Sequence, residues 1–476
     1  MKRLYHCLLM LAFFVQHISG QTDSASVAAL GLPVLSVRTV NGEMPTCDFV
    51  WAPEGEFGIG TTNKTKVPGR VILTHGGSTL YDSGEYGKNT SGMTIRIRGN
   101  TSAYYSLKKP YKIKLEVKAD MLARGDEKYN DKNWVLLDQG GDNLNAAVGF
   151  KLNELLQLGG WTPAYRYVNL LFNGNYHGVY MLAESVKRNT NARLNVDADG
   201  YIIERDAYWW NEPVYVSSSE GKKFTFKYPD QDVVTTEQKE YVKQFIDLME
   251  KAIDDGTYDQ SIDVQSFATW LLANDILGVG DAAGTNMFLL KRNASAKLEM
   301  ATLWDFDADY RTPDQWSEIH LNDRLFYFPA LLNSPNRTFS ARYRRLWQEQ
   351  GRSVIDQLCT FLTEFRQSDV AEGLRQSRPL DGATWNYPPD KVDDNIDNTL
   401  NWLTNRKQWL DTQIEAIDTI TSGIAVIRPE QYSEQHSAKY SEQHPAQLFT
   451  LSGQRVTTKN PTPGIYIRNG KKYIIF

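Results

Sequence analysis

Residues 280–307 of the chain, GDAAGTNMFLLKRNASAKLEMATLWDFD, bear more on the expected fold than any other stretch. They follow an apolar segment at 264–277, whose length and spacing predict a helix, and they begin with a glycine-containing loop. Two apolar runs, 287–291 and 298–303, flank a turn at 293–296, which predicts a β-hairpin. Polar side chains therefore stand in the loop before the hairpin and directly after it.

These polar residues are of the kinds that phosphoryl transfer requires. A carboxylate must face the attacking hydroxyl group, and carboxylate and amide oxygens must hold divalent metal ions beside the phosphates. In protein kinases an Asp and a later Asn share a loop, two strands follow, and a metal-binding Asp precedes a Phe. Asp281, Asn286 and Asp305 stand in this order, and Asp307 alternates with Asp305. The alternative is that these side chains cap turns, complete the loop's hydrogen bonds or face solvent.

A second group of polar residues surrounds a turn between two predicted strands, 93–98 and 111–117. Small residues in such a turn let backbone N–H groups approach phosphates, and lysines on the returning strand neutralise the phosphate charge. The candidates for these contacts are Arg98, Gly99, Asn100, Ser102, Lys108, Lys109, Lys112 and Lys114. The alternative, a solvated strand face, applies above all to Lys109 and Lys112.

Two glutamates are further candidates for the nucleotide site. Glu154 lies on a helix predicted at 143–158, where it would pair with a strand lysine and hold it toward the phosphates. Its alternative is a surface position. Glu184 ends an apolar strand, and it either faces the nucleotide or caps residues 185–188.

The order of these patterns predicts an α+β protein with a β-rich first half and a mostly helical second half. Asn173-Gly174 between two apolar runs predicts a hairpin, and Thr235 with Gln238 predicts a capping box at a helix start. We expect two lobes with a cleft between them. The expected segments are a signal peptide at 1–20, lobes at 21–187 and 188–420, a linker at 421–447 and a small β module at 448–476.

Composition limits the functions that the chain can have. The formal net charge is −5 and no long basic run occurs, which argues against a nucleic-acid binder. Lys2 and Arg3, a short apolar run and small residues before Gln21 predict a secretory signal. We expect no membrane-spanning segment in the mature chain, since its apolar runs are too short. Two cysteines, Cys47 and Cys359, remain after signal removal, and their spacing does not indicate whether they pair.

Taken together, residues 33–420 resemble the CotH kinase family. The stretches that carry the likeness are IRGNTS (97–102), KKPYKIK (108–114), WVLL (134–137) with Asp142, LFNGNYHGVY (171–180) with Glu184, GYIIE (200–204), KYPD (227–230), DAAGTN (281–286) and WDFD (304–307). The resemblance implies an atypical protein-kinase-like fold that uses ATP and a divalent metal ion, Mg²⁺ or Mn²⁺, to phosphorylate protein hydroxyl groups. It further implies Asp281 as the catalytic carboxylate and Asn286 and Asp305 as metal ligands. Lys108 or Lys114 would reach the phosphates.

Residues 448–476 resemble C-terminal sorting modules of proteins secreted by certain Gram-negative bacteria. This resemblance implies export to the cell surface or beyond, with the secretion machinery as a partner. The main alternative function is a non-catalytic kinase-like surface protein that binds a host or glycan ligand, which the many aromatic residues favour. Transfer of a nucleotidyl group is another alternative. A glycosidase based on Asp305 and Asp307 ranks last, because two carboxylates on one strand do not flank a sugar bond.

Overall fold

The computed structural model describes residues 24–138, 144–279, 282, 286–306, 317, 326–388 and 391–420, and the backbone of three strands within 448–475. The chain divides into two compact units, 1–417 and 418–476. Among the described residues, no helix combines the length and the apolar character needed to cross a membrane. Cys47 and Cys359 are both free thiols.

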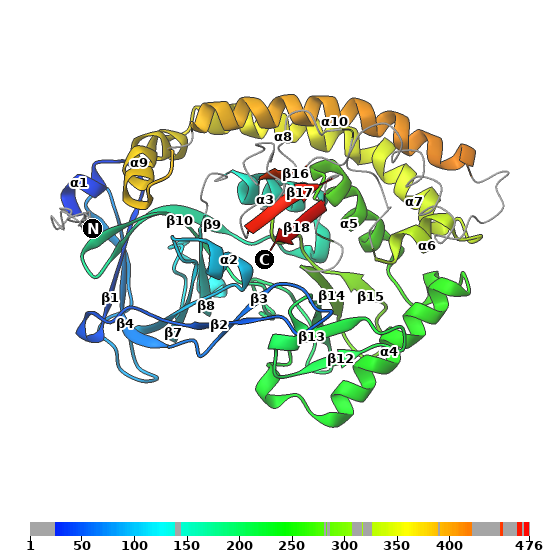
Figure 1. The fold of residues 1–476 in the computed structure, drawn as a ribbon, viewed down its shortest axis with the longest axis horizontal. Coiled ribbons are helices and arrows are strands. Elements are labelled where there is room, and N and C mark those ends of the chain that lie inside the picture. Colours follow the sequence, from blue (N-terminus) through cyan, green and yellow to red (C-terminus); the bar gives the residue numbers. More distant parts are fainter. Residues whose placement is uncertain are drawn as a thin grey trace, which may run out of the picture. The chain divides into compact units, whose positions relative to one another are not determined.

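The larger of the two main sheets is built from the first part of the chain and closes into a ring (Figure 1). Its strands are β1 (Val34–Thr39), β4 (Val67–His75), β5 (Ser78–Asp82), β6 (Met93–Ile97), β7 (Tyr111–Ala119), β8 (Asp131–Asp138), β9 (Tyr165–Phe172) and β10 (Asn175–Glu184). Their order is β1-β9-β10-β8-β7-β6-β4-β5, and β1 also pairs with β4. The side chains that point inward form one apolar cluster.

The strands form where the sequence alternates. On β7, Tyr111, Ile113 and Leu115 are buried, whereas Lys112 is half-buried and Lys114 is exposed, as the period of two predicts. The predicted turn at Asn173-Gly174 joins β9 to β10, and both residues have positive φ, 49° and 82°. A two-residue turn with two positive φ angles matches the twist of the strands that it connects.

A second, five-stranded sheet contains the predicted hairpin. Its strands are β11 (Tyr201–Arg205), β12 (Tyr215–Ser217), β13 (Lys223–Tyr228), β14 (Met287–Lys291) and β15 (Leu298–Met300), in the order β12-β13-β11-β14-β15. The β14–β15 hairpin is therefore not isolated: β14 pairs along its length with β11. A separate small sheet pairs β2 (Asp48–Trp51) with β3 (Ile59–Thr62).

Most of the helices lie in the second half of the chain, as expected. These are α4 (Thr236–Asp254), α5 (Val264–Leu277), α6 (Phe328–Asn333), α7 (Thr338–Leu346), α8 (Arg352–Arg366), α9 (Asp369–Trp385) and α10 (Val392–Ile420). The first half contains α3 (Asn145–Leu156) and the short α1 (Ser24–Ala28) and α2 (Thr101–Tyr105). The predicted capping box of Thr235 and Gln238 begins α4. Ion pairs join α8 to α10, and Figure 1 shows the two lying along each other.

The main hydrophobic core joins the helices to the first sheet. It contains Val148 and Leu152 of α3 and Leu271 of α5, and also Val179 and Met181, which point out of the ring from β10. The outward face of the ring is therefore covered by helices over β8 to β10. In the second unit, β16 (Leu448–Thr450), β17 (Gly464–Arg468) and β18 (Lys471–Ile475) form a three-stranded antiparallel sheet.

Candidate functional site

A group of cations gathers on the outward face of β6 and β7. Arg96 and Lys112 are directly paired across these strands, and their neighbours Ile95 and Ile113 point into the ring. Burial, together with the smaller effects of the charges of Arg96, Lys187, Arg98 and Lys227, lowers the pKa of Lys112 to about 7. Burial also lowers the pKa of Lys64, with Arg96 and Arg98 contributing. We call Lys64, Arg96, Arg98, Lys112, Lys187 and Lys227 the cationic cluster.

Some acidic residues oppose this charge. Lys227 Nζ lies 2.5 Å from a carboxylate oxygen of Glu204, and burial raises the pKa of Glu204 to about 7 even beside this lysine. The charge of Glu212 acts on Lys64, Arg96 and Lys227. Burial and like charges that depress the pKa of a lysine also lower the stability of the folded protein when no ligand is bound. Such an arrangement indicates a site for an anion.

The loop after β6 is held beside this cluster by two neighbours. Thr61 on β3 donates its hydroxyl to Gly99 O at 2.7 Å and its N–H to Asn100 Oδ1 at 3.2 Å. From the other side, Thr101 Oγ1 is hydrogen-bonded to the hydroxyl group of Tyr208. Gly99 has φ +82°, and a Cβ there would lie 2.4 Å from Ser102 Oγ. The turn therefore needs glycine at this position.

The segment after β15 meets the same loop. The Arg98 guanidinium carbon lies 5.9 Å from the centroid of the Trp304 ring. Burial raises the pKa of Tyr208, and the charge of Asp305 adds to that rise. Asp305 is thus near Tyr208, which binds Thr101. The structure brings together the predicted residues Arg98, Gly99, Asn100, Ser102 and Asp305.

Backbone geometry marks two of the predicted metal ligands. Asn286 has φ +61° and Asp305 has φ +66°, in the left-handed region that few residues other than glycine adopt. Such conformations persist where the surroundings fix them, often at functional sites. Next to Asp305, Phe306 is buried against α3, and its carbonyl oxygen accepts a hydrogen bond from Asn145 Nδ2 at 2.9 Å. Asp305 itself is exposed.

Two predicted residues, Asp281 and Asp307, lie outside the described residues. Within the described part of the chain, no group of three or more His, Cys, Asp and Glu side chains is arranged to hold a metal ion. Magnesium bound with a nucleotide needs only one or two carboxylates, because phosphate and water oxygens complete its shell. The amide oxygen of Asn286 and the carboxylate of Asp305 are oxygen ligands of that kind.

The structure places the predicted lysines in different surroundings. Lys108 is buried, and its Nζ lies 3.1 Å from Asp381 and 3.2 Å from Asp138, so its charge is already matched by two carboxylates. Lys109 Nζ donates to the carbonyl oxygens of Ala103 and Ser106, at 2.7 and 2.6 Å, and so caps the end of α2. Lys114 is exposed beyond Lys112 on the same strand.

The two candidate glutamates make contacts with other parts of the protein. Glu154 is exposed on α3 and pairs with Lys151 at 2.9 Å, one turn away on the same helix, rather than with a strand lysine. Glu184 is buried, and its oxygens accept hydrogen bonds from Arg124, from the Trp161 indole and from the backbone N–H of Ala164. Its carboxylate therefore ties β10 to its surroundings instead of facing a ligand.

Sequence reasoning did not connect the members of the cationic cluster with one another. Lys187 and Lys227 come from segments far from β7 in the chain, and no local pattern links them to it. Lys112 was detectable, because alternation places it on the outward face with Lys114. Which lysine of β7 is desolvated depends on how far other segments of the chain cover its side chain, and this coverage is set by tertiary contacts.

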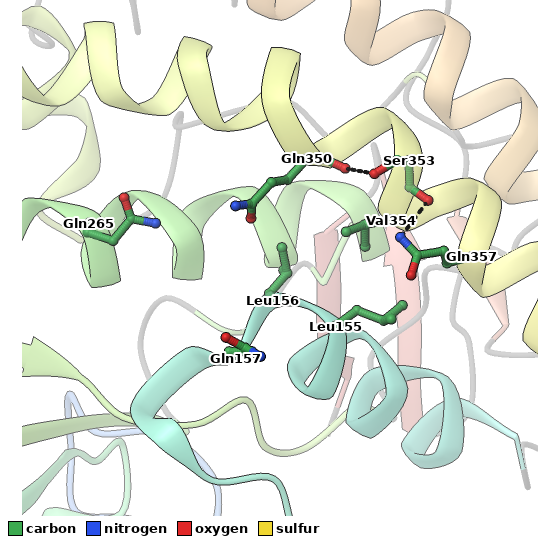
Figure 2. Close-up of a pocket in the computed structure, with 8 residues that line it drawn as sticks. All are labelled: Leu155, Leu156, Gln157, Gln265, Gln350, Ser353, Val354 and Gln357. Atoms are coloured by element: carbon green, nitrogen blue, oxygen red, sulfur yellow. Dashed lines mark hydrogen bonds between the residues drawn. The ribbon is translucent and has the colours of Figure 1, made fainter.

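A cavity of about 490 Å³ lies elsewhere, where the end of α3 meets α5 and α8 (Figure 2). Its lining is uncharged: Leu155, Leu156, Gln157, Gln265, Gln350, Ser353, Val354 and Gln357. Ser353 Oγ donates to Gln350 O at 3.0 Å, and Gln357 Nε2 donates to Ser353 O at 3.2 Å (Figure 2). Among the described residues that line the cavity, no side chain carries a charge that would bind phosphates.

Comparison with known proteins agrees with the resemblance seen in the sequence. The family model described as CotH kinase protein matches residues 95–410, which is more than half of the chain. The chain belongs to the CotH kinase family. This match includes the loop after β6, β7, Asn286 and Asp305, and it includes every member of the cationic cluster except Lys64.

Comparison with curated proteins and solved structures adds little. No curated protein matches the chain. Among solved structures, one match is a chain in the Shewanella oneidensis MR-1 toxin–antitoxin complex of HipA, HipB and operator DNA, with 13% identity and a TM-score of 0.27. The match covers 62% of each chain, which is less than two thirds of the solved one. A TM-score this low does not establish a common fold.

Proposed function

We propose that this CotH family protein transfers the terminal phosphoryl group of ATP to hydroxyl groups of a protein, with Mg²⁺ or Mn²⁺ as cofactor. The observation that carries the proposal is the desolvated Lys112 among the like charges of Arg96 and Arg98, next to the loop that Asp305 also approaches. Bound phosphates would relieve this repulsion. The β-rich and helical parts would act as two lobes, with the nucleotide between them.

In this proposal each group has a separate task. Lys112 and Arg96 would neutralise the phosphates, and backbone N–H groups of the Gly99 loop would approach the phosphate oxygens. Asn286 and Asp305 would hold the metal ion, which supplies charge neutralisation on the transferring group. Asp281 is proposed, from its place in the family motif, to orient and deprotonate the acceptor hydroxyl group.

We further propose that the protein acts outside the cytoplasm. Residues 1–20 have the charged start, apolar run and small-residue end of a secretory signal. The C-terminal module, which includes β16 to β18, would serve as a sorting signal for the secretion machinery. The acceptor would then be an exported or surface protein.

Mass spectrometry after incubation with ATP and Mg²⁺ or Mn²⁺ tests the reaction. The purified protein is mixed with extracted surface proteins of its source, and the wild type is compared with Asp305→Ala. We expect phosphate on Ser, Thr or Tyr with the wild type only. An added AMP would replace the proposal with nucleotidyl transfer. Absence of any modification, together with absence of nucleotide binding, would leave a non-catalytic binding protein.

A further inference from the structure

Exposed aromatic side chains gather beside the loop that follows β6. Phe49 and Trp51 lie on one face of β2, and both contact Tyr104 of α2, with ring centroids 5.1 and 6.0 Å apart. Tyr104 in turn contacts Tyr105 at 4.9 Å. Leu107 follows and is 71% exposed. We call Phe49, Trp51, Tyr104, Tyr105 and Leu107 the aromatic platform.

The platform is held in place by the same contacts that fix the loop. Thr61 of β3 binds Gly99 and Asn100, and this joins the β2–β3 hairpin to the residues that precede α2. Lys109 Nζ donates a hydrogen bond to Ala103 O of α2 and also lies 5.9 Å from the centroid of the Phe49 ring. An apolar surface that the fold holds rigidly exposed is characteristic of an interaction site.

The chemistry of the platform favours a polypeptide over a carbohydrate. Its rings meet edge to face, with interplanar angles of 79°, 63° and 87°, so they do not form the flat open surface on which a sugar stacks. Leu107 adds an aliphatic side chain that offers a sugar no hydrogen bond. Large aromatic side chains are the residues that most often anchor protein interfaces.

The neighbouring strand suggests the conformation of the partner. Within the described residues β2 pairs with β3 alone, and all four of its residues are exposed. Such an edge accepts an extended segment through main-chain hydrogen bonds while side-chain surfaces give specificity.

Charge indicates the composition of that segment. Lys109 Nζ lies 5.9 Å from the centroid of the Phe49 ring, and the charges of Lys109 and Lys64 both act on Cys47, which directly precedes β2, so positive charge lies beside the platform. We propose that the aromatic platform docks an extended, acidic segment with apolar side chains, from the polypeptide that accepts the phosphoryl group. The description of this partner as the acceptor rests on the proposed function, whereas the docking itself does not.

Fluorescence anisotropy with the full chain tests the docking in the absence of nucleotide. The probe is a fluorescein-labelled copolymer of Glu and Tyr, and labelled poly-Glu is the comparison without aromatic groups. Trp51, 60% exposed, and Tyr105, 52% exposed, are each replaced by Ala. The matched control is Leu248→Ala, because Leu248 is 64% exposed on α4.

We expect the copolymer to bind more tightly than poly-Glu, and each aromatic variant to weaken copolymer binding by about tenfold. The control should bind as the wild type does. Equal binding by all four proteins, or no binding by the wild type, would overturn the proposal. Displacement of the copolymer by cellohexaose would assign the platform to a glycan instead. Failure of phosphoryl transfer alone would leave the binding result standing and refute only the proposed function.

Discussion

The protonation of Lys112 offers a sharp test of the anion site. Its pKa is about 7 because burial and the charges of Arg96, Lys187, Arg98 and Lys227 disfavour the ammonium form. A bound phosphate would favour that form again. Nucleotide binding should therefore be coupled to proton uptake, and affinity should fall as the pH rises above 7.

The size of the effect follows from the two pKa values of Lys112. If bound phosphate restores the ordinary lysine pKa of about 10.4, affinity falls by nearly tenfold, or about 1.4 kcal/mol, for each pH unit between about 7 and 10. Between about pH 7.5 and 9 the expected loss is about twentyfold. The terminal phosphate, with a pKa of about 6, is ionised throughout this range and does not contribute.

The assay is isothermal calorimetry of ATP with Mg²⁺ at several pH values, for the wild type, Lys112→Arg and Lys118→Ala. The arginine variant keeps its charge at every pH of the range, so its affinity should be nearly flat. Lys118 is an exposed lysine on the same strand, and its variant should follow the wild type. A wild-type slope no steeper than that of Lys112→Arg would refute the reasoning.

The depressed pKa of Lys112 should have the opposite effect on stability: the free energy of unfolding should rise with pH, whereas ATP affinity falls. The pKa of Lys112 is lower in the folded state than in the unfolded chain, so the unfolded chain binds more protons between pH 7 and about 10. Its contribution makes the protein less stable as the pH falls through this window. Lys112→Met should raise the free energy of unfolding at pH 7 by about 1–2 kcal/mol while it abolishes ATP binding.

Three further substitutions distinguish residues that affect ATP binding from residues that affect the stability of the fold. Tyr208→Phe removes the hydrogen bond to the loop after β6, and we expect about threefold to tenfold weaker ATP binding by calorimetry with an unchanged melting temperature. Asp381→Ala leaves Lys108 buried with less counter-charge, so urea unfolding should show a loss of about 3–5 kcal/mol without a change in ATP affinity in the folded protein. Gly149→Ala would place a Cβ 2.4 Å from the Phe306 ring. It should cost about 1–3 kcal/mol in the same unfolding assay despite the better helix propensity of Ala, and it should weaken metal-dependent ATP binding.

Local sequence patterns predicted many of the elements correctly. The turn at Asn173-Gly174, the capping box at Thr235 and the helix at 264–277 each depend on a few adjacent residues, and each is present. The β14–β15 hairpin was also predicted, but not the three strands that extend it into a sheet. The pairing of β11 with β14 joins residues far apart in the chain, which no local pattern specifies.

In the candidate site, too, local patterns predicted some residues, whereas tertiary contacts determine the others. The motif order selected Asn286 and Asp305, and the structure gives both a left-handed backbone. The sequence favoured Lys108 and Lys114 over Lys112 for the phosphates, because local patterns do not show which lysine is desolvated beside other cations and which is already paired with carboxylates. The difference between Lys112 and Lys108 arises from Asp381, which neutralises Lys108 from a helix late in the chain.

Calorimetry of ATP binding tests the central claim most directly, with Mg²⁺ and with Mn²⁺, for the wild type and Asp305→Ala. The proposed function predicts binding that requires the metal ion and that the substitution abolishes. Lys118→Ala serves as the control for general effects of a surface substitution. Metal-independent binding that Asp305→Ala leaves unchanged, or no binding with either metal, would contradict the assignment of a nucleotide to this site.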